Sequence, residues 1–439
     1  MTVNVNDKIK RIIKEDDEVM IRTTRESYPF VASHGDGEFA YDVAGNKFLD
    51  FSSFIAVYNL GVNGNFAIRN AVKEQADLLT HSAFTDYYSE RPVRFAKKLL
   101  TMFPRDFGRV FFSNSGTEAN EAAIKFARLF KKGVYNIAFY GAFHGRTMGT
   151  LPLTASRLVH RENFGPLSGT VHVPYAYCYR CPLKLRYPDC GIACADYIRK
   201  YPLSKELPPN EVSAIVMEPI QGEGGYVVPP KEFVKEIRKI ATENGILLID
   251  DEIQAGYMRT GRFLALDNFG VEADIYTMAK ALGGGLPIGV TVTRRSLGNI
   301  KSGAHANTFG GNLLSIAAAE ASIDYVKENH SQFSRSVVEK GNYIMKRLKQ
   351  MMEKYEIIGD VRGIGLMIGV ELVKDKKSKE PAAAKREMII EDCFYNNLLL
   401  LPAGESTIRL IPPLTISYES IDKGLNIFEE AVKKYNKKR

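Results

Sequence analysis

The chain has 439 residues, of which 45% are hydrophobic and 25% are charged, a composition typical of a soluble globular protein with two or three domains. Its 59 basic and 51 acidic residues give a net charge of +8, but they are interspersed, so the basic stripe that nucleic-acid binding requires is not evident. No apolar run is long enough to span a membrane and the N-terminus lacks a signal-peptide pattern, so we expect a cytoplasmic protein.

Residues 1–65 are predicted to form an N-terminal arm and part of a small domain. The first 20 positions are mostly polar or charged, with a short stripe of isoleucines, which is typical of a frayed helix or arm. Two apolar runs then flank a turn signal at 44–46, and this pattern predicts a β-hairpin.

Residues 66–325 are predicted to form a large, doubly wound α/β domain. Short apolar runs with little polar alternation are typical of strands buried on both faces of a parallel sheet, and helical patterns separate them here. The clearest runs are RVFFS (109–113), VYNIAFY (134–140), VSAIVMEP (212–219) and GILLID (245–250).

The segment FFSNSGTEANEAA joins one of these runs to a helical pattern. Ser115, Gly116 and Thr117 stand at the start of the expected helix, where backbone N–H groups, a hydroxyl and the positive end of the helix dipole favour an anion. A well-capped helix without any ligand fits the same residues, so both interpretations stay open. A Walker-type phosphate loop is absent from the sequence.

Four cysteines gather in the segment YCYRCPLKLRYPDCGIAC, namely Cys178, Cys181, Cys190 and Cys194. Four thiols in so short a span are candidates for binding Zn²⁺ or an iron–sulfur cluster, although the central interval is shorter than in common zinc ribbons. A disulfide or free buried thiols explain the same pattern, so we assign no metal. Cys393 stands alone on a helical pattern and is expected in the core.

The run LLIDDEIQAG places Asp250, Asp251, Glu252 and Gln254 directly after a buried strand, where parallel sheets carry ligand-binding residues. A carboxylate at this position can pair with a buried cation or with a protonated ring nitrogen. Alternatively, paired acids at a strand end coordinate Mg²⁺ or cap the next helix.

The stretch TMAKALGGGLPIG contains a single charged residue, Lys280. Apolar neighbours disfavour its ammonium form and leave a nucleophilic amine that can form a Schiff base. The simpler alternative is a lysine that extends its head group to solvent. A desolvated lysine, a carboxylate for a ring nitrogen and an anion site are together what pyridoxal phosphate requires.

Residues 326–439 are predicted to form a smaller α+β domain. A long amphipathic helix is followed by a glycine-rich strand, GIGLMIGVEL, and by a further helix, strand and helix. The glycines Gly363, Gly365 and Gly369 suggest a dinucleotide-binding oxidoreductase, but their spacing fits poorly and the run continues as a strand, so we disfavour that class.

Seven ordered motifs closely resemble those of the class III, or ω-amino acid, aminotransferases: NSGTEANEAAIKFAR, AFHGRTMG, MEPIQGEGG, LLIDDEIQAGYMRTGRF, MAKALGGGLPIG, NTFGGN and IRLIPPL. The similarity covers roughly residues 25–415 in unbroken order. It implies a fold-type I pyridoxal-phosphate-dependent transferase with a large α/β domain and a small domain made from both chain ends. It also implies a homodimer or higher homo-oligomer with shared active sites.

The resemblance assigns roles around pyridoxal 5'-phosphate. By match, Lys280 holds the cofactor as a Schiff base and later moves the proton between Cα and C4′. Asp251 pairs with the pyridinium nitrogen, and Gln254 contacts the 3′-oxygen. The other cofactor-binding residues that the resemblance implies are Phe143 on the ring face, His144, Glu218, the phosphate-binding Ser115, Gly116 and Thr117, and Thr308 from the partner subunit.

The resemblance also points to substrate-binding residues. Arg409 matches the arginine that binds an α-carboxylate, and Glu223 matches the glutamate that pairs with it when the α-carboxylate is absent. Arg146 stands where several members bind a distal carboxylate, with a structural ion pair as the alternative. The stretch NLGVNGN (59–65) departs from the family pattern and puts the substrate-side wall, to which Tyr58 contributes, in doubt.

From this resemblance we expect an aminotransferase that moves the amino group of a small ω-amino acid, with 4-aminobutyrate as the leading donor, to 2-oxoglutarate by a ping-pong mechanism. One alternative is an amino acid racemase or epimerase, because returning the proton to the opposite face inverts Cα. Another is transamination of ornithine, lysine or acetylornithine.

Overall fold

The computed structural model describes residues 3–23, 28–63 and 65–436. The chain divides into two compact units, a central unit of Ala67–Ser334 and a terminal unit of Met1–Phe66 with Arg335–Arg439. The first two residues of the predicted N-terminal arm, and position 64 of NLGVNGN, lie outside the described residues. Among the residues that the structure describes, no helix combines the length and the apolar character needed to cross a bilayer.

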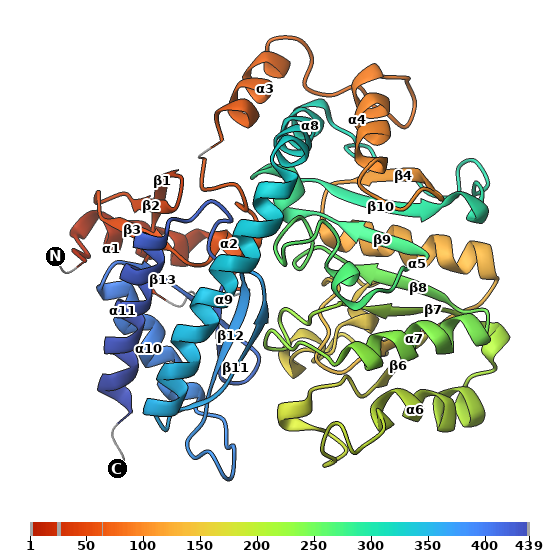
Figure 1. Cartoon of the computed structure of the whole chain (residues 1–439). Helices are drawn as coiled ribbons and strands as arrows, with labels where there is room; N and C mark the ends of the chain where they lie inside the picture. Colours follow the sequence, from red (N-terminus) through yellow and green to blue (C-terminus); the bar gives the residue numbers. More distant parts are fainter. Residues whose placement is uncertain (1–2, 24–27, 64, 437–439) are drawn as a thin grey trace. The chain divides into compact units, whose positions relative to one another are not determined.

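The central unit is built on a seven-stranded sheet with strand order β4-β10-β9-β8-β7-β5-β6 (Figure 1). The neighbours from β9 to β6 are parallel, and β10 is antiparallel to both β9 and β4. This arrangement confirms the predicted α/β class with a mostly parallel sheet. The strands are β4 (Phe107–Ser113), β5 (Tyr135–Phe139), β6 (Thr170–Val173), β7 (Val212–Met217), β8 (Leu247–Asp251), β9 (Ile275–Met278) and β10 (Gly289–Arg294).

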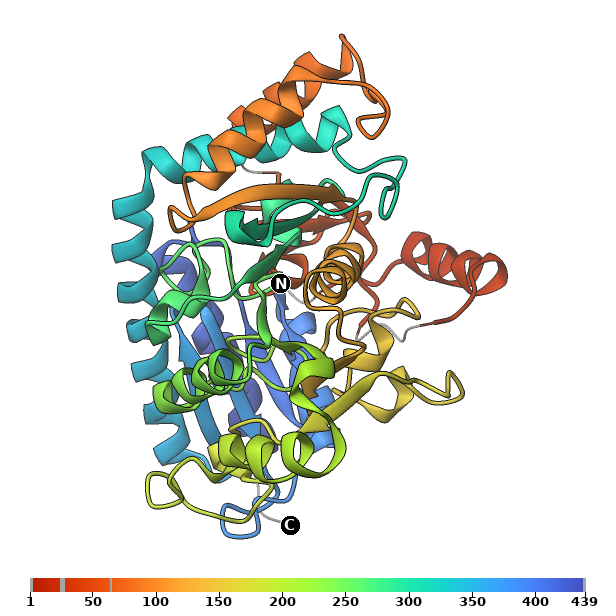
Figure 2. The same cartoon turned by 90° about the vertical axis from the view of Figure 1, so that its right-hand side faces the viewer.

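Helices cover both faces of this sheet. Figures 1 and 2 show α5 on one face and α7 on the other. The alanines of α5 allow its backbone to approach the sheet closely, and Ala123 and Ala127 join a buried cluster with Ala214 and Val216 of β7. The helices are α3 (Phe66–Ala76), α4 (Glu90–Leu100), α5 (Gly116–Lys131), α6 (Ala193–Lys200), α7 (Lys231–Glu243) and α8 (Leu313–Glu328).

The alternation of side chains along β8 determines which carboxylate meets which face of the sheet. Leu247 and Ile249 belong to the buried cluster that packs against α5. Because side chains alternate along a strand, Asp251 lies on the same face as these two residues and Asp250 lies on the opposite face. Two adjacent acids are therefore placed in different surroundings.

One strand of the central sheet differs from its prediction. The RVFFS run was expected to be buried on both faces, but it lies in β4, which is an edge strand of the sheet. Arg109 is exposed there and Phe111 is only partly buried. An edge strand has a neighbour on one side only, so its side chains are less fully covered than those of a central strand.

The terminal unit contains two four-stranded sheets, with orders β1-β2-β3-β13 and β11-β12-β15-β14. β2 and β3 pair antiparallel, which confirms the predicted hairpin. The strands are β1 (Ala32–Asp36), β2 (Phe39–Asp42), β3 (Lys47–Asp50), β11 (Ile358–Ile364), β12 (Met367–Leu372), β13 (Leu398–Leu399), β14 (Leu401–Ala403) and β15 (Thr407–Leu410). The helices are α1 (Asp7–Val19), α2 (Ser53–Ala56), α10 (Ala383–Tyr395) and α11 (Tyr418–Tyr435), while α9 (His330–Lys354) crosses from the central unit into this one.

The glycine-rich run GIGLMIGVEL was predicted to form a single strand. In the structure it forms the turn and the second half of a hairpin. β11 and β12 pair antiparallel, and Ile364 is the partner of Met367 across the turn. Gly365, in that turn, has φ 58°, a left-handed conformation that glycine adopts without a steric penalty. Cys393 is buried on α10, as expected for a core residue.

Candidate active site

Five strands of the central sheet end at the same edge. β5, β7, β8 and β9 are mutually parallel, and β4 has the same direction because both it and β9 are antiparallel to β10. The carboxyl edge of a parallel sheet is where α/β proteins bind ligands. The predicted site residues that follow these five strands are Ser115, Gly116 and Thr117 after β4, Phe143 and His144 after β5, Glu218 after β7, Asp251 and Gln254 at and after β8, and Lys280 after β9.

Asp251 is held by a hydrogen-bond network on the α5 face of the sheet. His144 Nδ1 lies 2.7 Å from Asp251 Oδ2, and Asn120 Nδ2 on α5 donates to the same oxygen at 2.7 Å. Ile253 N donates to Asp251 Oδ1 at 3.1 Å. Thr277 Oγ1 on β9 in turn donates to Asn120 Oδ1 at 2.7 Å, which fixes the amide that holds the carboxylate.

His144 and Glu218 are buried beside this carboxylate. Burial lowers the pKa of His144, but the hydrogen bond with Asp251 and the negative charges of Asp251 and Glu218 outweigh it, so the pKa is raised. Burial raises the pKa of Glu218 to about 7, against the opposing effects of His144 and of two backbone donors. Those donors are Phe143 N at 2.9 Å and Gly222 N at 2.8 Å.

The acidic run at the end of β8 is divided between the two faces. Asp250 and Glu252 are both buried, and neither carboxyl oxygen of Asp250 has a hydrogen-bond partner among the described residues. Burial, and then the charge of the nearby Glu252, raise the pKa of Asp250 well above its usual range, which favours its neutral form. No three His, Cys, Asp or Glu side chains within the described ranges are arranged to hold a metal ion, so the Mg²⁺ alternative finds no support here.

Lys280 stands on a strained turn directly after β9. It begins the 3₁₀ turn η7 (Lys280–Gly283) with φ 45°, which is uncommon for a residue with a side chain. Its neighbours Ala279 and Ala281 are buried, whereas Lys280 itself is half-buried. Strain of this kind persists where the surrounding structure enforces it and is concentrated at functional sites.

The first turn of α5 is capped by Ser115 and contacts the segment that follows β5. Ser115 is the N-cap and accepts from Glu118 N at 3.3 Å, as in any capped helix. Thr117 Oγ1 lies 2.7 Å from Thr150 Oγ1. A Cβ on Gly145, which has φ 133°, would lie 2.1 Å from Thr117 Oγ1, so only glycine lets the segment carrying Phe143 and His144 pass so close to the helix start.

A second group of side chains surrounds Phe143. The guanidinium carbon of Arg146 lies 5.7 Å from the centre of its ring, and the ring of His160 packs edge-on at 5.5 Å. Burial lowers the pKa of His160, as do Arg146 and Arg157, while Glu223 opposes them. His160 could not be predicted as a neighbour of Phe143 from the sequence, because 16 residues without a regular hydrophobic pattern separate the two.

Three further predicted site residues do not follow these five strands in the chain. Tyr58 and Arg409 belong to the terminal unit, where Tyr58 packs against Phe54 and Arg409 is buried on β15. Thr308 is exposed in the segment between β10 and α8.

The cysteine-rich segment belongs to the central unit but not to the group around Asp251. All five cysteines of the chain are free thiols, so the disulfide alternative is not the state seen here. The metal candidates Cys178, Cys181, Cys190 and Cys194 are not arranged as metal ligands in the part of the chain that the structure describes.

The residues at the sheet edge fit pyridoxal phosphate. Gln254 is buried, and its Oε1 has no hydrogen-bond partner among the described residues, which is costly unless a ligand supplies a donor. Gly222 lets this side chain lie against the backbone, since a Cβ there would come within 2.8 Å of Gln254 Cδ. A fixed carboxylate, an unsatisfied amide oxygen, a lysine and a helix N-terminus match the charged and polar groups of the cofactor.

Comparisons with known proteins agree with this geometry. The family model described as Aminotransferase class-III matches residues 20–432. A leucine/methionine racemase of Thermococcus litoralis is 37% identical over 96% of this chain and 95% of its own, and an alanine/serine racemase of Pyrococcus horikoshii is 37% identical over 92% and 86%. An acetylornithine aminotransferase of Methanothermobacter thermautotrophicus is 38% identical over 94% of this chain and 96% of its own.

Solved structures give the same result. A taurine:2-oxoglutarate aminotransferase from Bifidobacterium kashiwanohense, in complex with PLP and glutamate, superposes with a TM-score of 0.89 at 29% identity and covers 97% of this chain and 98% of its own. An amine transaminase from an uncultivated Pseudomonas species, in a PLP-bound form, gives a TM-score of 0.88 at 28% identity and covers 95% and 98%.

Proposed function

Because this chain belongs to the class III aminotransferase family, we propose that it is an amino acid racemase that acts on uncharged α-amino acids with pyridoxal phosphate as its cofactor. The observation that carries this proposal is the near full-length alignment with two racemases, whose printed substrates are leucine and methionine in one and alanine and serine in the other. The relatives reported above give no support to the expected preference for 4-aminobutyrate. Two of them are racemases, and they favour racemisation.

The residues at the sheet edge support chemistry at Cα. Pyridoxal phosphate, when bound, supplies an electron sink that weakens the bond between Cα and its hydrogen. Lys280 would hold the cofactor through its amine, and the same amine would move the proton at Cα. Asp251 would keep a proton on the ring nitrogen, and its bonds to His144 and Asn120 hold the carboxylate where that charge is needed.

The remaining residues would bind and orient. The N-terminus of α5, with Ser115, Gly116 and Thr117, would hold the phosphate, and the free Gln254 Oε1 would accept a hydrogen bond from the ring substituent. Racemisation and transamination would diverge at the return of the proton, which goes back to Cα in racemisation and not in transamination, where an oxo acid is then released. Control of that step therefore depends on side chains on the substrate side, where Phe143, Arg146 and Glu223 are the candidates in the central unit.

A second candidate function is transamination of an ω-amino group to 2-oxoglutarate. The acetylornithine aminotransferase relative supports it, and so does the exposed Arg146, which could accept a distal carboxylate. In that case Arg409 would bind an α-carboxylate and Glu223 would pair with it when the substrate lacks one. For this second reaction, we propose 4-aminobutyrate as the leading amino donor. For either reaction we propose a homodimer or higher homo-oligomer, in which Thr308 serves the partner's cofactor.

The reaction type can be tested with the holoenzyme. L-Leucine, L-methionine and L-alanine are each incubated without any oxo acid, and the enantiomers are separated by chiral chromatography. We expect the D-enantiomer to accumulate until the two forms are equal, and D-leucine to give the same final mixture. A parallel reaction with N-acetylornithine or 4-aminobutyrate and 2-oxoglutarate is assayed for glutamate. Glutamate formation without inversion of any of the three amino acids would favour the aminotransferase instead.

A further inference from the structure

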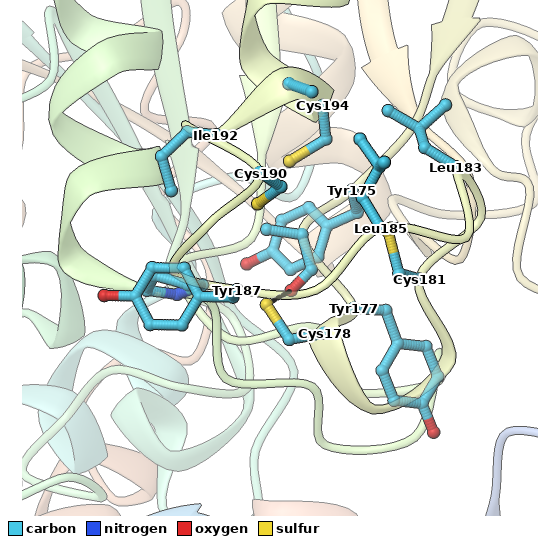
Figure 3. Close-up of a pocket in the computed structure, with 13 residues that line it drawn as sticks. Tyr175, Tyr177, Cys178, Cys181, Leu183, Leu185, Tyr187, Cys190, Ile192 and Cys194 are labelled. Carbon is cyan, nitrogen blue, oxygen red and sulfur yellow. Dashed lines mark hydrogen bonds between the residues drawn. The ribbon is translucent and has the colours of Figure 1, made fainter.

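The cysteine-rich segment of the central unit encloses a cavity of about 20 Å³ that lies outside the group around Asp251. Cys178 begins the 3₁₀ turn η3 (Cys178–Arg180), Cys181 follows it, Cys190 lies in the next loop and Cys194 lies in the first turn of α6. Figure 3 shows the four side chains around this cavity, together with apolar and tyrosine side chains. Four thiols from separate segments therefore share one apolar space.

Cys178 and Cys190 lie on the two loops that border this cavity. After burial itself, each of them raises the pKa of a neighbouring thiol, Cys190 that of Cys178 and both that of Cys194, as expected for thiols that share one space. Figure 3 shows the sulfur atoms of Cys178 and Cys190 directed toward the middle of the cavity. Cys178 is exposed and Cys190 is partly buried, so a small reagent can reach this pair, whereas Cys194 is buried.

The loop that joins this pair is held mainly by local contacts. Lys184 N donates to Cys181 O, Cys190 N donates to Arg186 O, and Gly191 N donates to Pro188 O, each within a few residues of its partner. A covalent bond between positions 178 and 190 would tie the two ends of the loop directly. The unfolded chain would lose entropy on such closure, which stabilises the folded form.

We propose that Cys178 and Cys190 form a reversible disulfide, making this cavity a thiol-modification site. The oxidant is a low-molecular-weight disulfide such as oxidised glutathione. The thiolate of Cys178 attacks one glutathione sulfur, and the other glutathione leaves as a thiolate that takes up the Cys178 proton. The thiolate of Cys190 then attacks the Cys178 sulfur, and the second glutathione leaves with the second proton. Two protein thiols are oxidised, and one disulfide is reduced to two thiols.

The cavity is connected to the candidate active site through Tyr175. Tyr175 lines the cavity, and its hydroxyl donates to the carbonyl oxygens of Glu218 at 3.1 Å and Pro219 at 3.2 Å. Glu218 in turn accepts from Phe143 N. Closing the disulfide would therefore fix the wall of the cavity that supports Glu218.

The test counts thiols in the intact holoenzyme. Reduced protein is incubated with oxidised glutathione, unfolded in denaturant and titrated with a thiol reagent. We expect five free thiols before oxidation, the number of cysteines in the chain, and three afterwards, because one disulfide consumes two. Peptide mapping should join Cys178 to Cys190, and the oxidised protein should unfold on the order of 5 °C higher than the reduced form.

Matched variants identify the pair. Cys178→Ser and Cys190→Ser should each abolish the intramolecular disulfide and the shift in unfolding temperature, whereas Cys181→Ser and Cys393→Ser should retain both. If one serine variant does not fold, the other variant tests the same bond. The peptide map of the oxidised, unsubstituted protein then identifies which two cysteines are joined. Retention of all five thiols, glutathione adducts alone, or a different pair in the map would overturn the proposal. None of these measurements depends on the proposed reaction.

Discussion

Asp251 and Asp250 show how adjacent residues with the same side chain acquire different roles. Asp251 faces α5 and is held by His144 and Asn120, whereas Asp250 faces away, where burial raises its pKa well above the usual range. The sequence predicts the importance of this strand end, and the alternation of side chains along β8 in the structure separates the two acids. It does not predict the partner of each acid, because Asn120 and His144 come from distant segments that only the packed sheet brings together.

Asp251→Asn should lower kcat/KM by about 100- to 1,000-fold, because the amide keeps the shape of the side chain but removes the charge that would hold a proton on the cofactor ring. The measurement is steady-state kinetics of whichever reaction the holoenzyme catalyses. His144→Gln, which removes a partner of Asp251 rather than the carboxylate, should cause a smaller loss.

Asp250→Asn is the matched control for that substitution. Asp250 is equally buried, and burial raises its pKa well above the usual range, so an amide resembles its neutral form. We expect its kcat/KM to stay within about threefold of the unsubstituted enzyme. Equal losses for the two variants would show that Asp251 contributes to folding rather than to the reaction.

At the scale of elements, hydrophobic patterns identify strands and helices better than they identify pairing. The runs at β5, β7 and β8 were predicted as buried strands and lie in the centre of the sheet. The run at β4 has a similar composition but lies at the edge, and the run at 363–372 is broken by a turn at Gly365. The periodicity of the sequence shows how much of a segment is apolar enough to be buried. Which strands become neighbours depends on the packing of the whole unit.

An ionic cluster joins two helices of the central unit. The side chain of Glu320 on α8 is 7% exposed and accepts from Arg94 Nε on α4 at 2.7 Å and from Arg91 Nε at 3.1 Å. Burial raises the pKa of Glu320, but these hydrogen bonds and the charges of Arg94 and Lys98 outweigh it and lower the pKa to about 2. Glu320 therefore contributes most to the link between α4 and α8 while it is ionised, beside the separate ion pair of Lys98 with Asp324 at 2.6 Å.

Glu320→Gln should lower the free energy of unfolding at pH 7 by roughly 3 kcal/mol, because a shift from 4.5 to about 2 corresponds to about 2.5 pKa units. Since the folded-state pKa lies below the unfolded value, this contribution is complete above pH 4.5 and is lost as the pH falls toward 2. The variant should lack that part of the pH dependence in urea unfolding curves.

Glu90→Gln is the control for this prediction. Glu90 contacts the same Arg94 at 3.1 Å, but its side chain is 87% exposed, and exposed ion pairs contribute little. We expect a change below about 0.5 kcal/mol. A comparable loss for Glu90→Gln, or an unchanged acid limb for Glu320→Gln, would contradict the account of this cluster.

At the scale of the whole molecule, the family and its cofactor could be predicted from motif order, and five of the seven motifs follow strands that end at one edge of the central sheet. Transamination of 4-aminobutyrate could not be predicted securely, because racemases and aminotransferases share Lys280, Asp251 and the fold. The roles of the individual site residues stay predictions. Those on the substrate side come from segments in both units, and motif order alone does not fix their arrangement.

The central claim is that Lys280 carries pyridoxal phosphate at the carboxyl edge of the central sheet, and borohydride reduction tests it most directly. Reduction of the holoenzyme should bleach its colour and fix the cofactor irreversibly, and peptide mapping should place the added mass on the segment 277–289, which contains one lysine. Lys280→Ala should fold, as judged by circular dichroism, and retain no label. Label on another lysine, or a colourless protein that takes up no added pyridoxal phosphate, would contradict the account.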